Sequence, residues 1–261
     1  AQVFQHSFRR LMLGAAWLVA AALGPQARAA DMPVDLELIL AVDVSGSMDL
    51  REQQLQRAGY VRAITHPDVL RAIAGGFHRR IAVAYVEWAG TPIQMTSVDW
   101  RIIDSEAAAR RFANALEDLP LNTYRGTSIS SALAYSSRLF DGNGLEGIRR
   151  VIDISGDGVN NQGVPVELVR SAVLATGIII NGLPIMIDPA TRARGGFPGL
   201  DRYYEDCVIG GPGSFVVSIT ALDKFADAIR QKLVLEIAGL EPGVVPVQQR
   251  GTPRVDCLFV E

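Results

Sequence analysis

Histidine and lysine are scarce in this chain of 261 residues, and each scarcity excludes a kind of site. Three histidines are too few for a histidine-rich zinc centre, the more so because His6 lies in a predicted leader. The two lysines, Lys224 and Lys232, fall in the last predicted helix, so neither is placed to hold a phosphate group. The P-loop, G-x-S-x-G and H-E-x-x-H patterns are all absent from the sequence. The sequence therefore lacks the common motifs of nucleotide binding, serine hydrolysis and zinc proteolysis.

An excess of positive charge is missing as well. The chain has 25 basic and 28 acidic residues, which gives a formal net charge of −3. The first 29 residues hold three arginines and no acid, so their removal would take the charge from −3 to −6. Nucleic acids and anionic membranes are poor partners for an acidic surface of this kind.

No apolar run is long enough for a typical membrane span. The longest, at residues 11–24, has about 14 residues, whereas a spanning helix needs roughly 20. Two arginines precede this run, and Ala27-Arg28-Ala29 has the form of a cleavage site. This order is typical of a secretory signal peptide, which we predict at residues 1–29, and it predicts a periplasmic or secreted protein. An uncleaved anchor is the alternative.

Only two cysteines, Cys207 and Cys257, occur in the sequence. In an oxidising compartment an even number of cysteines favours a disulfide, which here would join the C-terminal tail to a loop 50 residues upstream. Two separate thiols are the alternative, because sequence alone does not establish the geometry.

Apolar runs alternate with helical patterns along residues 34–237. Buried strands are predicted within residues 36–43, 81–88, 151–155 and 178–186, an edge strand at 93–97 and a further strand at 214–219. Apolar residues at helical spacing lie between them, at residues 50–64, 106–119, 129–140, 165–176 and 222–237. This alternation predicts a three-layer α/β/α sandwich with a mostly parallel central sheet and one antiparallel edge strand. Residues 238–261 are expected to form a C-terminal tail.

Oxygen-bearing side chains follow two of the predicted strands and open one predicted helix. Asp43, Ser45 and Ser47 follow the first strand, Asp157 follows a later buried strand, and Thr127 begins a helix. Because ligands of open α/β sheets bind beyond the carboxyl ends of the strands, we expect these five side chains to meet there. Carboxylates and hydroxyls suit a hard divalent cation such as Mg²⁺. Helix capping by the serines and a turn at the aspartate are the alternative roles.

The pattern Asp43-x-Ser45-x-Ser47, with Thr127 and Asp157 downstream, resembles the metal-ion-dependent adhesion site of von Willebrand factor type A (vWA) domains. The order of the predicted elements resembles the Rossmann-like fold of those domains. The resemblance implies that the three hydroxyls coordinate Mg²⁺ directly, with Mn²⁺ or Ca²⁺ as alternatives. It also implies that the two aspartates hold coordinated waters, or bind directly in another state. A carboxylate from a partner protein would complete the octahedron.

Two other stretches, residues 155–161 and 203–237, resemble a bacterial exported subgroup of vWA domains whose function is not established. The first includes Asn160 and Asn161, which are expected at the rim of the site or in a turn. The leading hypothesis is therefore a non-enzymatic, adhesion-type module that binds a partner carboxylate through Mg²⁺.

Two other hypotheses come from different classes of protein. In a metal-dependent hydrolase or phosphotransferase, Asp43 would act as the nucleophile. That chemistry usually needs a second acid two residues further on, where Ser45 stands. A scaffold that works with an ATPase is the third hypothesis, but such partners are intracellular and the predicted leader argues against it.

Overall fold

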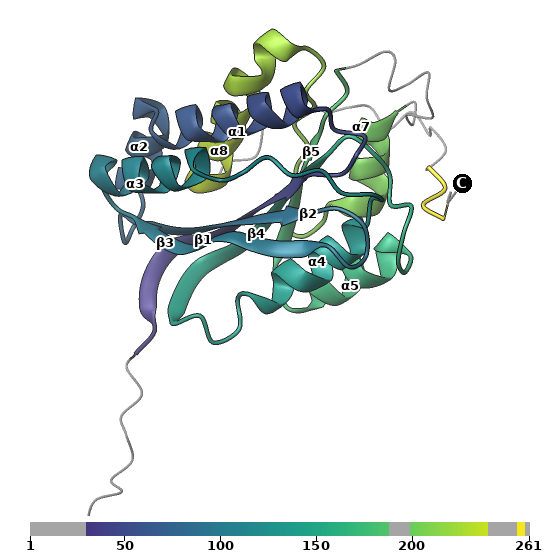
Figure 1. Cartoon of the computed structure of the whole chain (residues 1–261). Coiled ribbons are helices and arrows are strands. Elements are labelled where there is room, and N and C mark those ends of the chain that lie inside the picture. Colours follow the sequence, from purple (N-terminus) through teal and green to yellow (C-terminus); the bar gives the residue numbers. More distant parts are fainter. Residues whose placement is uncertain (1–29, 188–198, 240–254, 259–261) are drawn as a thin grey trace, which may run out of the picture. The chain divides into compact units, whose positions relative to one another are not determined.

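A five-stranded sheet forms the centre of the unit Met32–Glu261 (Figure 1). The computed structural model describes residues 30–187, 199–239 and 255–258. Ala1–Asp31 is a separate unit, and the predicted signal peptide lies outside the described residues. In chain order the strands are β1 (Met32–Asp43), β2 (Ile81–Trp88), β3 (Gln94–Ile103), β4 (Leu145–Gly156) and β5 (Ile179–Pro184).

The strands lie in the order β3-β2-β1-β4-β5. All neighbouring strands are parallel except β3, which pairs antiparallel with β2 at the edge. This arrangement confirms the predicted fold class. It also makes β1 the central strand and β4 its neighbour, so the carboxyl ends of these two strands lie side by side.

Helices cover both faces of the sheet (Figure 1). Helices α1, α2, α3 and α8 lie on one face, and α4 and α5 lie on the other. The helices are α1 (Leu50–Ile64), α2 (Pro67–Ala74), α3 (Glu106–Glu117), α4 (Ile129–Arg138), α5 (Val166–Ala175), α7 (Leu200–Tyr203) and α8 (Phe225–Ala238). The described residues also include two short segments, the π-helical η1 (Tyr204–Val208) and the 3₁₀-helical η2 (Leu222–Lys224).

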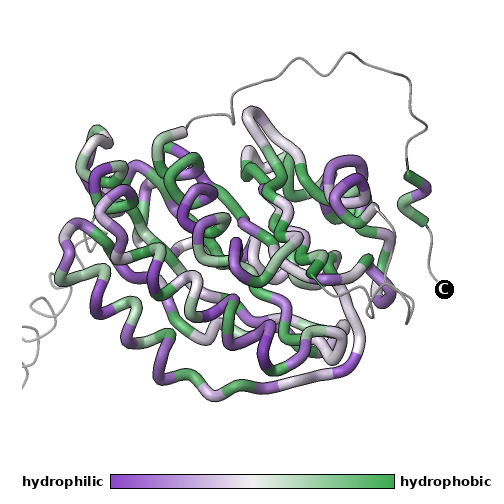
Figure 2. The backbone as a smooth tube through the Cα atoms, turned by 90° about the horizontal axis from the view of Figure 1, so that it is seen from above, coloured by the Kyte–Doolittle hydropathy of each residue, from purple (hydrophilic) through white to green (hydrophobic). Residues whose placement is uncertain are grey.

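Alternating side chains of the sheet build two separate hydrophobic cores. In β1, Leu38 and Leu40 face the core under α1 and α8, whereas Ile39 and Ala41 face the core over α4 and α5. Burial on both faces explains why the strand is a continuous apolar run. In Figure 2 hydrophobic and hydrophilic stretches alternate along the helices, as expected when one face of each helix lies on a core.

The segment predicted as a strand at residues 214–219 is not a regular strand. It runs beside β5 and makes only isolated parallel bridges, which pair Val216 with Gly182 and Ile219 with Ile185. Backbone hydrogen bonds flank the two bridges, and just before the first bridge the Asn181 side chain takes part as well, because its Oδ1 accepts a hydrogen bond from the Phe215 amide at 3.1 Å. The prediction of a full strand was therefore wrong, and β5 is the last strand of the described sheet.

The disulfide predicted between Cys207 and Cys257 is present and joins η1 to residues 255–258. This finding excludes the alternative of two separate thiols. The long loop expected at residues 187–213 contains α7 and η1, and its residues 188–198 lie outside the described part. Among the described helices, none combines the length and the apolar character needed to cross a membrane.

Candidate metal centre

The turn that follows β1 lies beside the loop that leads to α4. A parallel bridge pairs Ser45 with Tyr124, and the Tyr124 amide donates to the Val44 carbonyl at 3.1 Å. The turn continues to Asp49, which caps α1 by accepting a hydrogen bond from the Glu52 amide at 2.8 Å. Residues 43–49 are therefore fixed at both ends.

Four of the five predicted site residues form one hydrogen-bonded chain. The Ser45 amide donates to Asp43 Oδ1 at 2.7 Å, and the hydroxyls of Ser45 and Ser47 are 2.9 Å apart. Ser47 Oγ donates to Asp157 Oδ1 at 2.6 Å, which joins the end of β1 to the end of β4. The structure thus brings together residues that are 110 positions apart in the sequence.

Thr127, the fifth predicted residue, lies beside the same loop. Its amide donates to Asn161 Oδ1 at 2.9 Å, and its carbonyl accepts from the Asn161 amide at 2.9 Å. A Cβ atom placed on Gly158 would lie 3.8 Å from Thr127 Oγ1, so this hydroxyl is close to the residue that follows Asp157. No hydrogen bond between the Thr127 hydroxyl and the other four side chains is among those described.

The asparagines expected at the rim hold the loop after β4 against α4. Asn161 binds the backbone of Thr127 in both directions, and Asn160 Oδ1 accepts from the Ser130 amide at 3.0 Å. Both side chains therefore fix the backbone near the candidate site.

The two aspartates of the site are buried close to one another. Asp43 is 0% exposed and Asp157 is 8% exposed. Burial, followed by the nearby negative charge of Asp157, raises the pKa of Asp43 well above its ordinary value. Burial likewise raises the pKa of Asp157, although the hydrogen bond from Ser47 opposes this shift. In the described part of the chain, Asp43 Oδ2 and Asp157 Oδ2 have no hydrogen-bond partner.

These observations fit a hard divalent cation. Two buried carboxylates in proximity repel one another, and each keeps one oxygen that no donor satisfies. The candidate ligand atoms are all oxygens, and they include the neutral hydroxyls of Ser45 and Ser47. Mg²⁺, Mn²⁺ and Ca²⁺ prefer ligands of this kind. The described residues contain no group of three or more His, Cys, Asp or Glu side chains that could hold a metal. Ion binding by the five residues therefore remains a prediction.

Sequence reasoning did not identify Tyr204, which lies at the same place. A Cβ atom on Gly156 would lie 2.8 Å from Asp43 Oδ2 and 3.0 Å from the Tyr204 hydroxyl. The Tyr204 ring belongs to the core beneath the site, and the neighbouring Tyr203 hydroxyl accepts from the Asn160 amide at 3.2 Å. The sequence feature that could have indicated Tyr204 was a pair of tyrosines in a long loop, the second of them three residues before Cys207.

A second buried polar group was also missed, between the sheet and α8. Lys232 Nζ lies 2.7 Å from Asp153 Oδ1 and also pairs with Glu236 Oε1, while Asn181 Nδ2 donates to Glu236 Oε1 at 3.0 Å. The three charged side chains are each 1% exposed or less. The signal in the sequence was a lone lysine four residues before a glutamate in an apolar helix.

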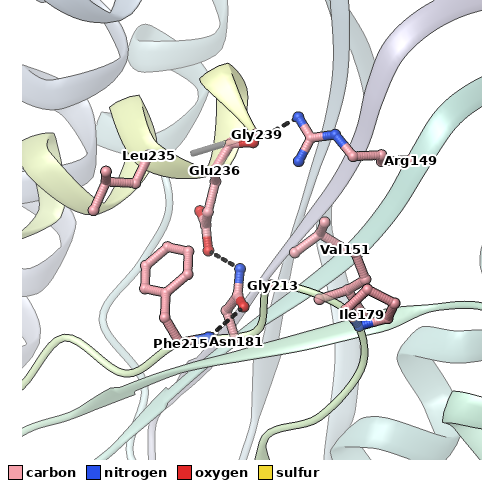
Figure 3. Close-up of a pocket in the computed structure, with 10 residues that line it drawn as sticks. Arg149, Val151, Ile179, Asn181, Gly213, Phe215, Leu235, Glu236 and Gly239 are labelled. Atoms are coloured by element: carbon pink, nitrogen blue, oxygen red, sulfur yellow. Dashed lines mark hydrogen bonds between the residues drawn. The ribbon is translucent and has the colours of Figure 1, made fainter. Parts of the chain in front are cut away.

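A cavity of about 230 Å³ borders this cluster (Figure 3). At its upper edge Arg149 donates to the carbonyls of Glu236 and Ile237, at the end of α8. Its lining consists of Arg149, Val151, Ile179, Asn181, Pro212, Gly213, Phe215, Leu235, Glu236 and Gly239. None of the five predicted ligands lines this cavity, so it is separate from the candidate metal centre.

The chain was compared with protein families and with curated proteins. A family model described as "Protein of unknown function (DUF1194)" matches residues 33–241, which is most of the chain. The search of curated proteins found no significant match.

Solved structures similar to this chain include three vWA-type proteins. The vWF domain of the type V pili tip protein Mfa5 from Porphyromonas gingivalis is 10% identical, with a TM-score of 0.56 over 83% of this chain and 99% of that chain. BatB from Bacteroides thetaiotaomicron is 22% identical, with a TM-score of 0.51 over 78% of this chain and 99% of that chain. Proximal thread matrix protein 1 from the mussel byssus, in a structure with a zinc-occupied MIDAS motif, is 16% identical, with a TM-score of 0.55 over 79% of this chain and 47% of that chain.

These likenesses establish the fold alone, because the sequence identities are low. The chain has the vWA-type α/β fold expected from the sequence. It spans less than half the length of the mussel protein, and 31% of the pilus adhesin SpaC from Lactobacillus rhamnosus GG, which it also resembles.

Proposed function

The chain belongs to the DUF1194 family of proteins of unknown function, and from this premise we propose that it is a protein-binding, adhesion-type module. A Mg²⁺ ion held by Asp43, Ser45, Ser47, Thr127 and Asp157 would capture a carboxylate of a partner protein. One observation carries the proposal: two buried aspartates from neighbouring strands, joined through serine hydroxyls, each keep an unsatisfied oxygen. We further propose a periplasmic or secreted location, which the disulfide supports.

The chemistry of the donors explains why a partner carboxylate would be favoured. The bound ion supplies a positive charge that attracts an anionic oxygen. Neutral hydroxyls from Ser45, Ser47 and Thr127 would leave most of that charge available, whereas direct carboxylate ligands would cancel it. Aspartates that act through water or hydrogen bonds would balance the charge without removing the attraction. The zinc-occupied MIDAS motif of the mussel protein supports a metal at such a site in this fold.

An enzymatic role for Asp43 has less support. A phosphotransferase site of this kind usually has a lysine that holds the phosphate, but Lys232 is 1% exposed and paired with Asp153 and Glu236. Lys224 lies in η2, where its described ion pair is with Asp223. We therefore propose a binding role and no catalysis.

Calorimetric titration with Mg²⁺ tests the proposal directly. The protein from residue 30 onward should bind one Mg²⁺ per chain, and Asp43→Ala should abolish binding because it removes a carboxylate at the centre of the site. Thr127→Ala should weaken binding strongly, since it removes one direct ligand. Asp99→Ala, which changes an exposed aspartate of β3, is the matched control and should bind normally. Equal affinity in all four proteins would refute the proposal.

A further inference from the structure

Tyr204 brings a hydroxyl to the inner side of the candidate metal centre. Its side chain is 0% exposed, and within the described part of the chain its hydroxyl has no hydrogen-bond partner. A buried hydroxyl without a partner is costly and rare in folded proteins, so such a group calls for an explanation. The explanation must lie among the atoms that surround this hydroxyl.

Asp43 presents an acceptor that is unsatisfied in the same way. Its Oδ1 accepts from the Ser45 amide, whereas its Oδ2 is without a hydrogen-bond partner in the residues described. Both Asp43 Oδ2 and the Tyr204 hydroxyl lie near the position of a Cβ on Gly156, at 2.8 Å and 3.0 Å. They are therefore no more than 5.8 Å apart, the sum of these two distances. Because neither atom has a direct hydrogen-bond partner among the described residues, a bridge through one buried water is the arrangement that fits this distance.

We propose that Tyr204 is a positioning residue of the metal centre, whose hydroxyl donates to Asp43 Oδ2 through one buried water. With Ser45 on one oxygen and Tyr204 on the other, the Asp43 carboxylate would be held in one orientation toward the ion. Gly156 is part of this arrangement, because any larger residue would place a Cβ atom within about 3 Å of both atoms. This inference rests on the proposed function, since it concerns the same site.

The protonation state of Tyr204 suits a donor. The ordinary pKa of a tyrosine phenol is about 10. The phenol therefore keeps its proton at neutral pH and can donate it to a carboxylate. A tyrosine beside two acids is a donor that does not add a charge to the site.

The segment that carries Tyr204 is anchored on both sides. Before it, the Tyr203 hydroxyl accepts from the Asn160 amide in the loop after β4. After it, Cys207 forms the disulfide with Cys257, and the backbone of Gly210 exchanges hydrogen bonds with Ile180 of β5 at 2.9 Å and 3.1 Å. These anchors leave the Tyr204 ring little freedom, as a positioning role requires.

The test compares Mg²⁺ affinity in wild type, Tyr204→Phe and a matched control. Tyr204→Phe keeps the buried ring and removes only the hydroxyl, and we expect it to weaken Mg²⁺ binding about 10–100-fold, as is typical when a group that supports a metal ligand is removed. Tyr60→Phe is the control: Tyr60 is 1% exposed, its hydroxyl also lacks a partner among the described residues, and it lies in the core on the other face of the sheet. It should bind Mg²⁺ as wild type does. Normal affinity in Tyr204→Phe would overturn the inference.

A second readout, on the metal-free protein, separates this inference from the proposed function. Proton NMR should show a slowly exchanging hydroxyl signal that disappears in Tyr204→Phe and shifts in Asp43→Asn, but not in Tyr60→Phe. Absence of that signal would overturn the contact between Tyr204 and Asp43. If the signal is present but wild type binds no Mg²⁺, the contact stands, whereas the proposed function and the role of Tyr204 in ion binding both fail.

Discussion

At the scale of single residues, Asp153 shows how burial governs the charge of a side chain. It is 0% exposed, and its neighbours in the cluster are Lys232 and Glu236 of α8. Burial and the charge of Glu236 raise the pKa of Asp153 to about 7, although Lys232 acts in the opposite direction. Two carboxylates share one ammonium group, so a proton on Asp153 relieves the excess negative charge.

This shift predicts a stability that depends on pH. The pKa of an aspartate in an unfolded chain is about 3.9, so between roughly pH 4 and pH 7 the folded state binds more protons than the unfolded state. The stabilisation from Asp153 is therefore fully present below about pH 4 and is lost as the pH rises through about 7. Thermal unfolding of metal-free protein from pH 5 to pH 8 should show wild type losing stability relative to Asp153→Asn.

The exposed Asp99 provides the matched control for that series. Asp99→Asn should follow the wild-type dependence on pH, because its carboxylate lies at the surface in both states. An identical dependence in wild type and Asp153→Asn would show that Asp153 is already ionised in the folded protein.

The sequence could suggest the oxygen ligands but not this cluster. Asp43, Ser45 and Ser47 lie within five positions of one another, in a pattern that is informative by itself. Asp153 and Lys232 are far apart in the sequence, and each lies in a segment whose apolar periodicity predicts only the element that carries it. Tyr204 was not predicted as part of the site because a buried hydroxyl becomes significant only when its surroundings are known.

At the scale of elements, the buried strands were predictable because both of their faces are apolar. β2 begins and ends as predicted, at Ile81 and Trp88. β4 was predicted at residues 151–155 but begins at Leu145, because its first six residues are exposed or half-buried and carry no continuous apolar run. Their strand conformation comes from pairing with the first half of β1, which is a tertiary effect.

The disulfide predicts a further property of the segment α7–η1. Opening it removes a covalent link that typically contributes about 2–4 kcal/mol to stability, so a reductant should lower the thermal midpoint of wild type. Hydrogen exchange should also become faster at Tyr204 to Val208, because Cys207 would lose its anchor. Both effects can be measured on the same reduced and oxidised samples.

Cys257→Ser is the control for this prediction. Its midpoint should match that of reduced wild type and should not respond to reductant, since Cys257 is only half-buried and its replacement leaves the core around Cys207 intact. If reductant leaves both the midpoint and the exchange of wild type unchanged, the disulfide does not stabilise this segment.

At the scale of the whole molecule, the candidate metal centre joins segments that are distant in the sequence. Its residues come from the ends of β1 and β4 and from the loop before α4, and the sheet order makes those two strands neighbours. The meeting of Asp43 with Asp157 could be predicted, because parallel strands present their carboxyl ends at one edge. The position of the Thr127 hydroxyl relative to the others depends on loop contacts with Asn161, which periodicity does not predict.

This convergence predicts that Mg²⁺ stabilises the fold as a whole. The unfolded chain cannot bring these segments together, so an ion that binds only the folded state adds stability according to its concentration. At 100 times the dissociation constant the gain is about 2.7 kcal/mol. For a domain of this size that corresponds to a rise of roughly 5–10 °C in the thermal midpoint. Scanning calorimetry at several Mg²⁺ concentrations, at a fixed pH of 7.5, measures this rise.

The dependence on concentration distinguishes site binding from a general salt effect. The midpoint of wild type should increase with the logarithm of Mg²⁺ concentration above the dissociation constant, and chelation should reverse the increase. Asp43→Ala should give a flat response, whereas Asp99→Ala should respond as wild type does. A parallel rise in Asp43→Ala would mean that Mg²⁺ acts elsewhere on the protein, because that variant lacks the buried carboxylate from which the site is built.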